Sequence, residues 1–189
     1  MRSVFALSLV ILAALPAAAP AQVTGPSATS LAAEEPQMRL DRLFAELRRA
    51  RNERAAERIS GRIWQEWFKS GSASIDLLMQ WSQKAIEDKK YDAAMDLLDQ
   101  VVTLAPDYAE GWNRRATLHF TMDNYAKSMA DIDRTLRLEP RHFGALGGMA
   151  TILKNTGRKE AAMRAYERVL EVYPMMRSAQ TELGKLADE

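Results

Sequence analysis

The 189-residue sequence contains no cysteine and only two histidines. The absence of cysteine excludes a disulfide framework, a cysteine nucleophile and any zinc or iron–sulfur site that needs thiolate ligands. An excess of one charge is also missing, because 26 Lys and Arg residues stand against 25 Asp and Glu residues. This balance gives no general electrostatic reason for binding nucleic acid or an acidic substrate. We therefore expect no nucleic-acid partner.

The residue patterns that carry catalysis or metal binding are missing as well. His119 and His142 have no second histidine or carboxylate at a known metal-binding spacing. No G-x-S-x-G motif and no glycine-rich phosphate loop is present. Asp92, Asp96 and Asp99 recur along one expected helix, but like charges at this spacing repel, which favours a solvated face over a cation site. The sequence predicts no enzymatic activity, no cofactor and no metal.

The first residues have the pattern of a secretory signal peptide. Arg2 is the only charge before Glu34, and the apolar run 4–15 is followed by small residues. This run is closer in length to the core of a signal peptide than to the ~20 residues of a membrane-spanning helix. We predict that the signal peptide, residues 1–21, is cleaved after Ala21; the alternative is that it stays as a membrane anchor.

The segment after the signal peptide is poor in large apolar side chains. Residues 22–36 read QVTGPSATSLAAEEP, a mixture of Pro, Ala, Ser and Thr with little to bury. A segment that buries little apolar surface does not offset the entropy lost on ordering. We therefore predict a disordered linker over residues 22–38.

The rest of the chain repeats with a period of 34 residues. Prolines, small residues and large apolar residues carry this period: Pro106, Pro140 and Pro174; Ala94, Ser128 and Ala162; and Leu98, Ile132 and Tyr166. Small residues recur where two helices approach closely, and large apolar residues recur where the space between them must be filled. Each period also divides at a polar break into two stretches with helical spacing, which predicts a helical hairpin.

This pattern resembles the tetratricopeptide repeat (TPR) family, whose 34-residue helical hairpins have a W…A…F…P signature. The middle unit carries residues at the family positions, namely Trp112, Ala116, Tyr125, Ser128, Ile132 and Pro140. It departs from the family where Arg115 replaces the usual leucine and His119 the usual tyrosine. The resemblance implies an all-α, right-handed solenoid of stacked hairpins.

The predicted organisation has one divergent hairpin before the clear repeats. The segments are the N-terminal TPR-like hairpin 39–74, repeats 75–108, 109–142 and 143–176, and a C-terminal capping helix 177–189. In the divergent hairpin Arg48 stands where a small residue belongs and the closing proline is missing, which is typical of a terminal cap. We expect the aromatic residues Trp64, Trp67, Phe68 and Trp81 to lie in the core.

In the TPR family, one face of each first helix lines the concave groove of the solenoid, where peptides are usually held. The resemblance places these partner-binding residues on that face: Met79, Gln83, Glu110, Asn113, Arg114, Thr117, Thr121, Gly144, Gly147, Thr151 and Asn155. Asn113 and Arg114 are best suited to hold a peptide backbone or carboxylate, the alternative being a solvated helix face. TPR domains that clamp the acidic tails of chaperones use a Lys and Asn pattern that this face does not reproduce.

Three glycines lie within one expected helix, although each costs roughly 0.5 to 1 kcal/mol relative to alanine there. They are Gly144, Gly147 and Gly148. One hypothesis is that they form a shallow floor that a partner backbone can approach closely. The alternative is close packing against the neighbouring unit.

The divergent hairpin is basic, with nine basic and five acidic residues from Arg39 to Lys69. It has two stripes, Ile59, Ile63 and Trp67, and Arg54, Arg58 and Arg62. A basic amphipathic helix is suited to lie on an anionic membrane. We favour the alternative that the hairpin buries its apolar stripe against the next unit.

The sequence thus predicts a non-enzymatic interaction scaffold or adaptor of the bacterial periplasm. It would bind a partner polypeptide through the concave groove, in cell-envelope assembly or regulation. The assignment to bacteria depends on the signal peptide and on resemblance to small exported bacterial TPR proteins. The alternatives are a self-assembling module, in which one end of the solenoid packs on a second copy, and a protein bound to the membrane surface. We expect a monomer or a weak homo-oligomer.

Overall fold

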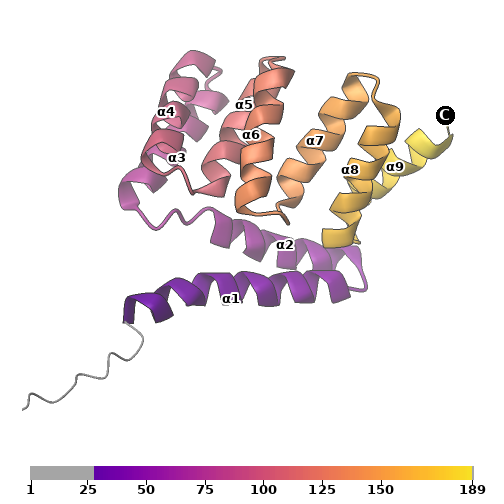
Figure 1. The fold of residues 1–189 in the computed structure, drawn as a ribbon, viewed down its shortest axis with the longest axis horizontal. Helices are drawn as coiled ribbons and strands as arrows, with labels where there is room; N and C mark the ends of the chain where they lie inside the picture. Colours follow the sequence, from indigo (N-terminus) through magenta and orange to yellow (C-terminus); the bar gives the residue numbers. More distant parts are fainter. Residues whose placement is uncertain (1–27, 189) are drawn as a thin grey trace, which may run out of the picture.

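The structure, a computed structural model, describes residues 28–188, which form nine α-helices and no strand (Figure 1). The helices are α1 (Ala28–Arg49), α2 (Glu53–Trp67), α3 (Ala73–Glu87), α4 (Tyr91–Leu104), α5 (Ala109–Thr121), α6 (Tyr125–Leu138), α7 (Phe143–Asn155), α8 (Lys159–Val172) and α9 (Arg177–Asp188). The predicted all-α repeat fold is therefore confirmed.

Three helical hairpins, α3–α4, α5–α6 and α7–α8, stack side by side, and α9 packs against α8 (Figure 1). The turn inside each hairpin has one residue with positive φ: Lys89, Asp123 and Gly157. These positions are 34 residues apart, so the repeat extends to the backbone conformation of the turn. Glycine adopts this conformation without strain, whereas the other two residues adopt it at a cost.

The repeated columns form the hairpin cores. Ala94, Ser128 and Ala162 are fully or almost fully buried where the two helices of a hairpin approach closely. The Ser128 hydroxyl donates a hydrogen bond to the Ala116 carbonyl at 2.8 Å, which satisfies the polar atom of this column. The small residues therefore allow close approach of the helix backbones.

The α1–α2 hairpin does not stack on α3 as a preceding repeat would, since α2 makes no extended contact with α3. The hairpin instead runs across the lower ends of the repeats in Figure 1. Its apolar stripe packs on Phe143 and Tyr173, which lie at the start of α7 and just after α8. The prediction that this hairpin stacks as an N-terminal cap is therefore wrong, because the hairpin packs across the solenoid. Arg48 is exposed and does not lie at a close helix crossing.

An aromatic cluster fixes this docking. The Trp67 ring stacks on the imidazole of His142 with centroids 4.0 Å apart. Trp64 packs edge-on against His142 and Phe143 with both centroid separations at 5.4 Å. Rings in these arrangements interact favourably beyond the apolar area that they bury. The position of the hairpin therefore depends on contacts with residues about 75 positions later in the chain.

Two of the aromatic residues expected in the core are exposed. The side chain of Phe68 is 45% exposed and that of Trp81 is 53% exposed, whereas Trp67 is buried and Trp64 is half-buried. Trp81 is exposed because α4 is the only helix in the described structure that makes extended contacts with α3.

Helix α1 begins within the segment predicted to be a disordered linker. Residues 28–38 are helical, with Pro36 inside the helix, although residues 22–27 lie outside the described part of the chain. The scarcity of large apolar residues suggested disorder, but Ala, Leu and Glu in this segment favour helix formation.

The predicted signal peptide lies outside the described residues. Within residues 28–188, no helix has the length and apolarity needed to cross a membrane.

Candidate functional site

The groove of this protein is the surface formed by α3, α5 and α7, with α2 along one edge. Helices α5 and α7 contact each other directly. Trp64 of α2 lies against Gly144 of α7, and Phe68, just after α2, lies 5.6 Å from the guanidinium of Arg114 on α5. Two cavities open on this surface.

The first cavity lies between α5 and α7 and has a volume of about 130 Å³. It is lined by Asn113, Ala116, Thr117, Phe120, Ser128, Ile132, Gly144, Ala145, Gly148, Thr151 and Ile152. The hydroxyls of Thr117 and Thr151 donate hydrogen bonds to carbonyls of their own helices, at 2.9 Å each. The cavity is therefore mainly apolar, and its size suits one aliphatic side chain.

The second cavity lies between α3 and α5 and has a volume of about 430 Å³. It is lined by Phe68, Asp76, Met79, Gln80, Gln83, Lys84, Glu87, Tyr108 and Arg114. The Tyr108 hydroxyl is buried without a hydrogen-bond partner in the described structure, and burial raises the pKa of this phenol. This cavity is wider and more polar than the first.

A buried polar network underlies the groove. Glu110 is 2% exposed and His142 is fully buried, and the Nε2 atom of His142 lies 3.2 Å from a carboxylate oxygen of Glu110. The Nδ1 atom accepts the backbone N–H of Ala145 at 3.1 Å, so the hydrogen-bond pattern places the proton on Nε2. Asn113 donates its amide N–H to the same carboxylate at 2.8 Å. This network joins the second repeat to the third and caps α7.

The groove has no excess of positive charge. Arg114 is held by Gln83 and by Glu110, at 3.3 Å from the carboxylate. Lys84 pairs with Asp88 at 2.7 Å. The basic groups beside the second cavity are thus neutralised by the chain itself, which weakens any attraction for an acidic ligand.

The predicted groove residues divide into four groups. Asn113, Thr117, Gly144 and Thr151 line the first cavity, and Met79, Gln83 and Arg114 line the second. Glu110 lies beneath the surface in the polar network. Thr121, Gly147 and Asn155 line neither of these two cavities. Asn113 and Arg114 both donate hydrogen bonds to Glu110, whereas the amide oxygen of Asn113 has no hydrogen bond within the described residues.

The glycines of α7 have different surroundings. A Cβ atom on Gly144 would lie 2.8 Å from the ring of Trp64, so this glycine allows α2 to pack closely. A Cβ on Gly148 would meet Ile132 at an ordinary distance of 3.5 Å, and one on Gly147 would meet nothing within 4 Å. Close packing accounts for Gly144 alone, and its partner is α2 instead of an adjacent repeat.

Sequence reasoning missed Trp64, Phe68 and Tyr108 as groove residues. Trp64 and Phe68 were expected in the core as large aromatic residues, and Tyr108 comes just before the first residue of α5. A spacing pattern identifies which face is apolar but not which part of the fold covers it. No signal in the sequence placed α2 beside α7.

The departures from the TPR pattern at Arg115 and His119 form a separate cluster outside the two groove cavities. Arg115 makes two 2.8 Å hydrogen bonds to Asp131 of α6 and a third at 2.8 Å to Asp99 of α4. The Nε2 atom of His119 lies 3.9 Å from Asp131, and burial lowers the pKa of this imidazole. Arg115 thus joins the first two repeats by ion pairs, and Asp99 serves as its partner. Within residues 28–188 no three acidic or histidine side chains converge as a metal site would require.

Comparison with known proteins identifies the repeat. The tetratricopeptide repeat family model matches residues 144–174. A TPR repeat-containing protein of Rhizobium etli is 53% identical over 158 residues, which cover 84% of this chain and 78% of that protein. The small glutamine-rich tetratricopeptide repeat-containing protein 2 of Saccharomyces cerevisiae is 24% identical over 62% of this chain and 34% of its own length.

Solved TPR structures have the same fold. The first TPR domain of Spaghetti (RPAP3), bound to an HSP90 peptide, matches 60% of this chain and 90% of its own with a TM-score of 0.58 and 24% identity. The TPR2B domain of yeast Sti1, in a complex with Hsp70, matches 62% of this chain and 98% of its own with a TM-score of 0.57 and 15% identity. The repeat pattern, the stacked hairpins and the Rhizobium relative all indicate the same family. The chain belongs to the tetratricopeptide repeat family.

Proposed function

We propose that this protein is a non-enzymatic scaffold or adaptor that binds a partner polypeptide in its groove. The observation that carries the proposal is the apolar cavity of about 130 Å³ between α5 and α7, which opens beside the Asn113 amide. A preformed apolar pocket with a few polar groups at its rim is the usual form of a binding site. One aliphatic side chain of the partner fills the pocket, and a backbone N–H donates to the Asn113 amide oxygen.

The expected partner segment is neutral or apolar, not an acidic tail. Arg114 and Lys84 are already paired within the described part of the chain, so neither of these two cations is free to bind a carboxylate. Burying an unpaired carboxylate next to Glu110 and Glu87 would be unfavourable. The solved TPR domains described above bind chaperone peptides, but the charges of this groove favour a different ligand.

The test fills the cavity without disturbing the core. Thr117 and Thr121 are both exposed on α5, and each hydroxyl bonds the carbonyl four residues earlier. Only Thr117 lines the first cavity, so Thr117→Trp blocks the pocket and Thr121→Trp is the matched control. Both variants are compared with the wild type in capture from a periplasmic extract, with partners identified by mass spectrometry.

We expect Thr117→Trp to lose a captured protein that the wild type and Thr121→Trp both retain. The proposal fails if both tryptophan variants capture the same protein as the wild type, since the partner would then use another surface. Circular dichroism confirms that both variants keep the wild-type helix content.

We infer that the protein acts in the bacterial periplasm, in cell-envelope assembly or regulation. This proposal is supported by the signal-peptide pattern of residues 1–21 and by the bacterial relative. N-terminal sequencing of protein from a periplasmic fraction is the direct measurement. A chain that begins at Gln22 agrees with export and cleavage, whereas a membrane-bound chain that retains Arg2 contradicts cleavage.

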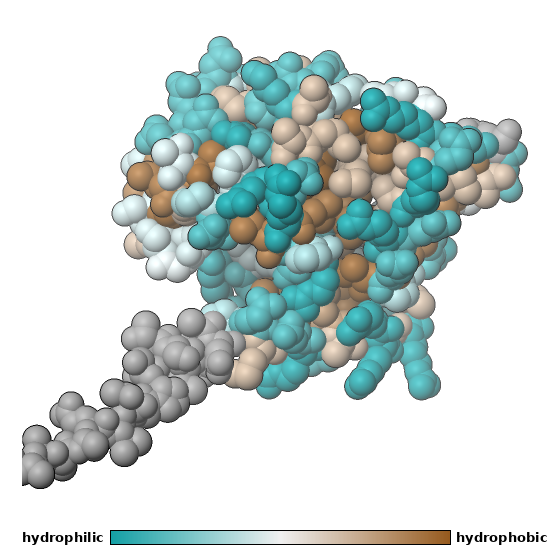
Figure 2. Space-filling view, viewed as in Figure 1, coloured by the Kyte–Doolittle hydropathy of each residue, from teal (hydrophilic) through white to brown (hydrophobic). Residues whose placement is uncertain are grey.

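A second candidate, self-assembly, is favoured by the open end of the solenoid at α3. In the later repeats the residue equivalent to Trp81 packs on the preceding hairpin. Arg115 bonds Asp99, and Met149 packs against a cluster that includes Ala116 and Ile132 of the second repeat. In residues 28–188 no hairpin covers Trp81, and apolar residues reach the surface at this end, on the left of Figure 2. Light scattering tests the candidate. A mass above that of the monomer that Trp81→Ser abolishes would support it, and a monomer at all concentrations would exclude it.

A further inference from the structure

The α1–α2 hairpin concentrates the positive charge of the protein. Residues 39–69 contain nine basic and five acidic residues, whereas residues 70–189 contain 16 basic and 18 acidic residues. The near-neutral total therefore hides a basic hairpin attached to a slightly acidic solenoid. Such an asymmetry creates a local positive potential even where the net charge of the chain is small.

Much of this charge is unpaired. Arg39, Arg62 and Lys69 form ion pairs with glutamates of the same hairpin. Six further arginines are exposed and have no ion pair with any residue that the structure describes: Arg42, Arg48, Arg49, Arg51, Arg54 and Arg58. The positive charge is thus available to an external anion.

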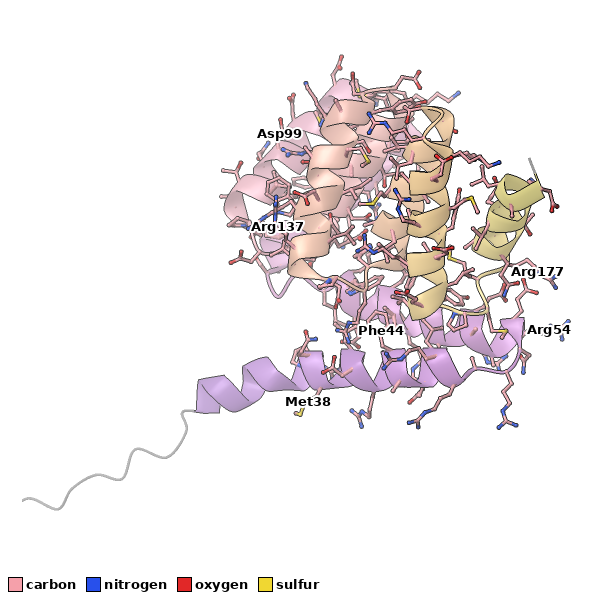
Figure 3. The ribbon with its side chains drawn as sticks, turned by 45° about the vertical axis from the view of Figure 1, so that its right-hand side comes forward. Met38, Phe44, Arg54, Asp99, Arg137 and Arg177 are labelled. Atoms are coloured by element: carbon pink, nitrogen blue, oxygen red, sulfur yellow. The ribbon has the colours of Figure 1, made fainter. Side chains whose placement is uncertain are left out.

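The unpaired arginines lie away from the solenoid. On α1, Leu43 and Phe44 are buried, whereas Arg42 and Arg49, seven residues apart, are exposed on the opposite face. In Figure 3, Phe44 points toward the solenoid and Met38 points away from it, and Arg54 lies at the turn between the two helices. The surface over α1 is mostly hydrophilic in Figure 2. These arginines form an outward basic surface across both helices.

A shallow cleft on this surface gathers three guanidinium groups. It has a volume of about 240 Å³ between α1 and α2 and is lined by Arg39, Arg42, Leu43, Glu46, Arg62, Gln65 and Glu66. Glu46 holds Arg62 at 3.1 Å and Glu66 holds Arg39 at 3.4 Å, so Arg42 is the one cleft arginine without an ion pair in the described structure. A phosphate in this cleft would be contacted by Arg42 and by the two positioned arginines.

The apolar side of the hairpin is not available to a membrane. Ile63 is fully buried and Trp67 is buried against His142 and Phe143. The hairpin therefore cannot insert an apolar face between lipids while it remains docked on the solenoid. Any attraction to a membrane must come from charge alone.

We propose that the outward basic surface of the α1–α2 hairpin binds the anionic headgroups of a lipid bilayer, without insertion. Of the six unpaired arginines only Arg42 lies in the cleft, and the others are spread over both helices and the turn between them, which suits the planar array of phosphates on a membrane. Within residues 39–69 the one exposed aromatic residue, Phe68, lies beside Arg114 in the groove and not among these arginines, where it would be needed for stacking on nucleic-acid bases. Export, which the signal-peptide pattern of residues 1–21 predicts, would also bring this hairpin close to a bilayer during translocation.

The test compares two double variants that change the net charge equally. Arg42→Gln with Arg49→Gln removes charge from the outward surface. Arg158→Gln with Arg164→Gln is the control, because both residues are exposed, unpaired in the described structure and lie on the α7–α8 hairpin. Each mature chain, residues 22–189, is sedimented with phosphatidylcholine vesicles and with vesicles that also contain phosphatidylglycerol. The neutral vesicles measure binding that does not depend on headgroup charge.

We expect stronger binding to the anionic vesicles, which high salt abolishes by screening. Each arginine near an anionic surface raises the binding constant about fivefold. The α1 double variant should therefore bind the anionic vesicles roughly 25-fold more weakly than the wild type. The control should bind them as strongly as the wild type. Equal binding to neutral and anionic vesicles, or an equal loss in both double variants, would overturn the proposal. Binding to a DNA duplex without binding to anionic vesicles would also overturn it.

Discussion

Two glycines of α7 provide a sharp test of how the N-terminal hairpin packs. Gly144→Ala and Gly147→Ala each gain about 0.5 to 1 kcal/mol from helix propensity. At Gly147 the new methyl group meets nothing within 4 Å, so the variant should be stabilised by that amount. At Gly144 the methyl group would lie 2.8 Å and 3.0 Å from two ring atoms of Trp64, so the ring must move.

The Trp64 ring has little freedom to move. It packs edge-on against Trp67, His142 and Phe143, with ring centroids 5.1, 5.4 and 5.4 Å away. Inserting a methyl group into such packing costs about 1 to 3 kcal/mol. Because both variants replace glycine by alanine in the same helix, the gain from helix propensity largely cancels when their free energies of unfolding are compared. We therefore expect Gly144→Ala to be less stable than Gly147→Ala by about 1 to 3 kcal/mol.

Urea denaturation followed by circular dichroism measures this difference. With a typical slope of about 2 kcal/mol per molar urea, the two midpoints should differ by on the order of 0.5 to 1.5 M. Trp64→Leu supplies the control background, because Gly144→Ala should become stabilising once the indole ring is removed. If Gly144→Ala and Gly147→Ala are equally stabilised in the wild-type background, α2 does not pack on α7 and the docking described above is wrong.

Two other predictions concern the same packing and the inter-repeat cluster. Trp67→Ala should destabilise the protein by about 3 to 5 kcal/mol because it removes a buried ring. Trp81→Ser removes an exposed ring and should change the free energy of unfolding by about 0.5 kcal/mol or less. Thermal unfolding measures both effects. Burial holds the pKa of His119 below its usual value of 6.5. The unfolded chain therefore takes up the proton first as pH falls through about 6.5, and stability decreases from there toward the lower folded pKa. His119→Gln should flatten this part of the stability profile, and an unchanged slope between pH 7 and 5 would contradict the assignment.

The sequence determined the repeat because its determinants are local. A TPR hairpin is specified by a small residue such as Ala162, a large one such as Tyr166 and a turn such as Gly157, all within one 34-residue period. Stacking then follows, since each hairpin has an apolar face that only a neighbour can cover. The face of α5 that carries Asn113 and Thr117 was predictable for the same reason, because helical periodicity fixes which residues share a face.

The tertiary structure alone decided where the N-terminal hairpin lies and how the groove is closed at its edge. The stripe of Ile63 and Trp67 predicts that one face of the hairpin is buried, but it does not predict which element of the fold covers that face. Here the partner is Phe143, about 75 residues away in sequence, and Gly144 is what allows Trp64 to approach. Contacts over such separations depend on shape complementarity between finished elements, which periodicity in one chain does not encode.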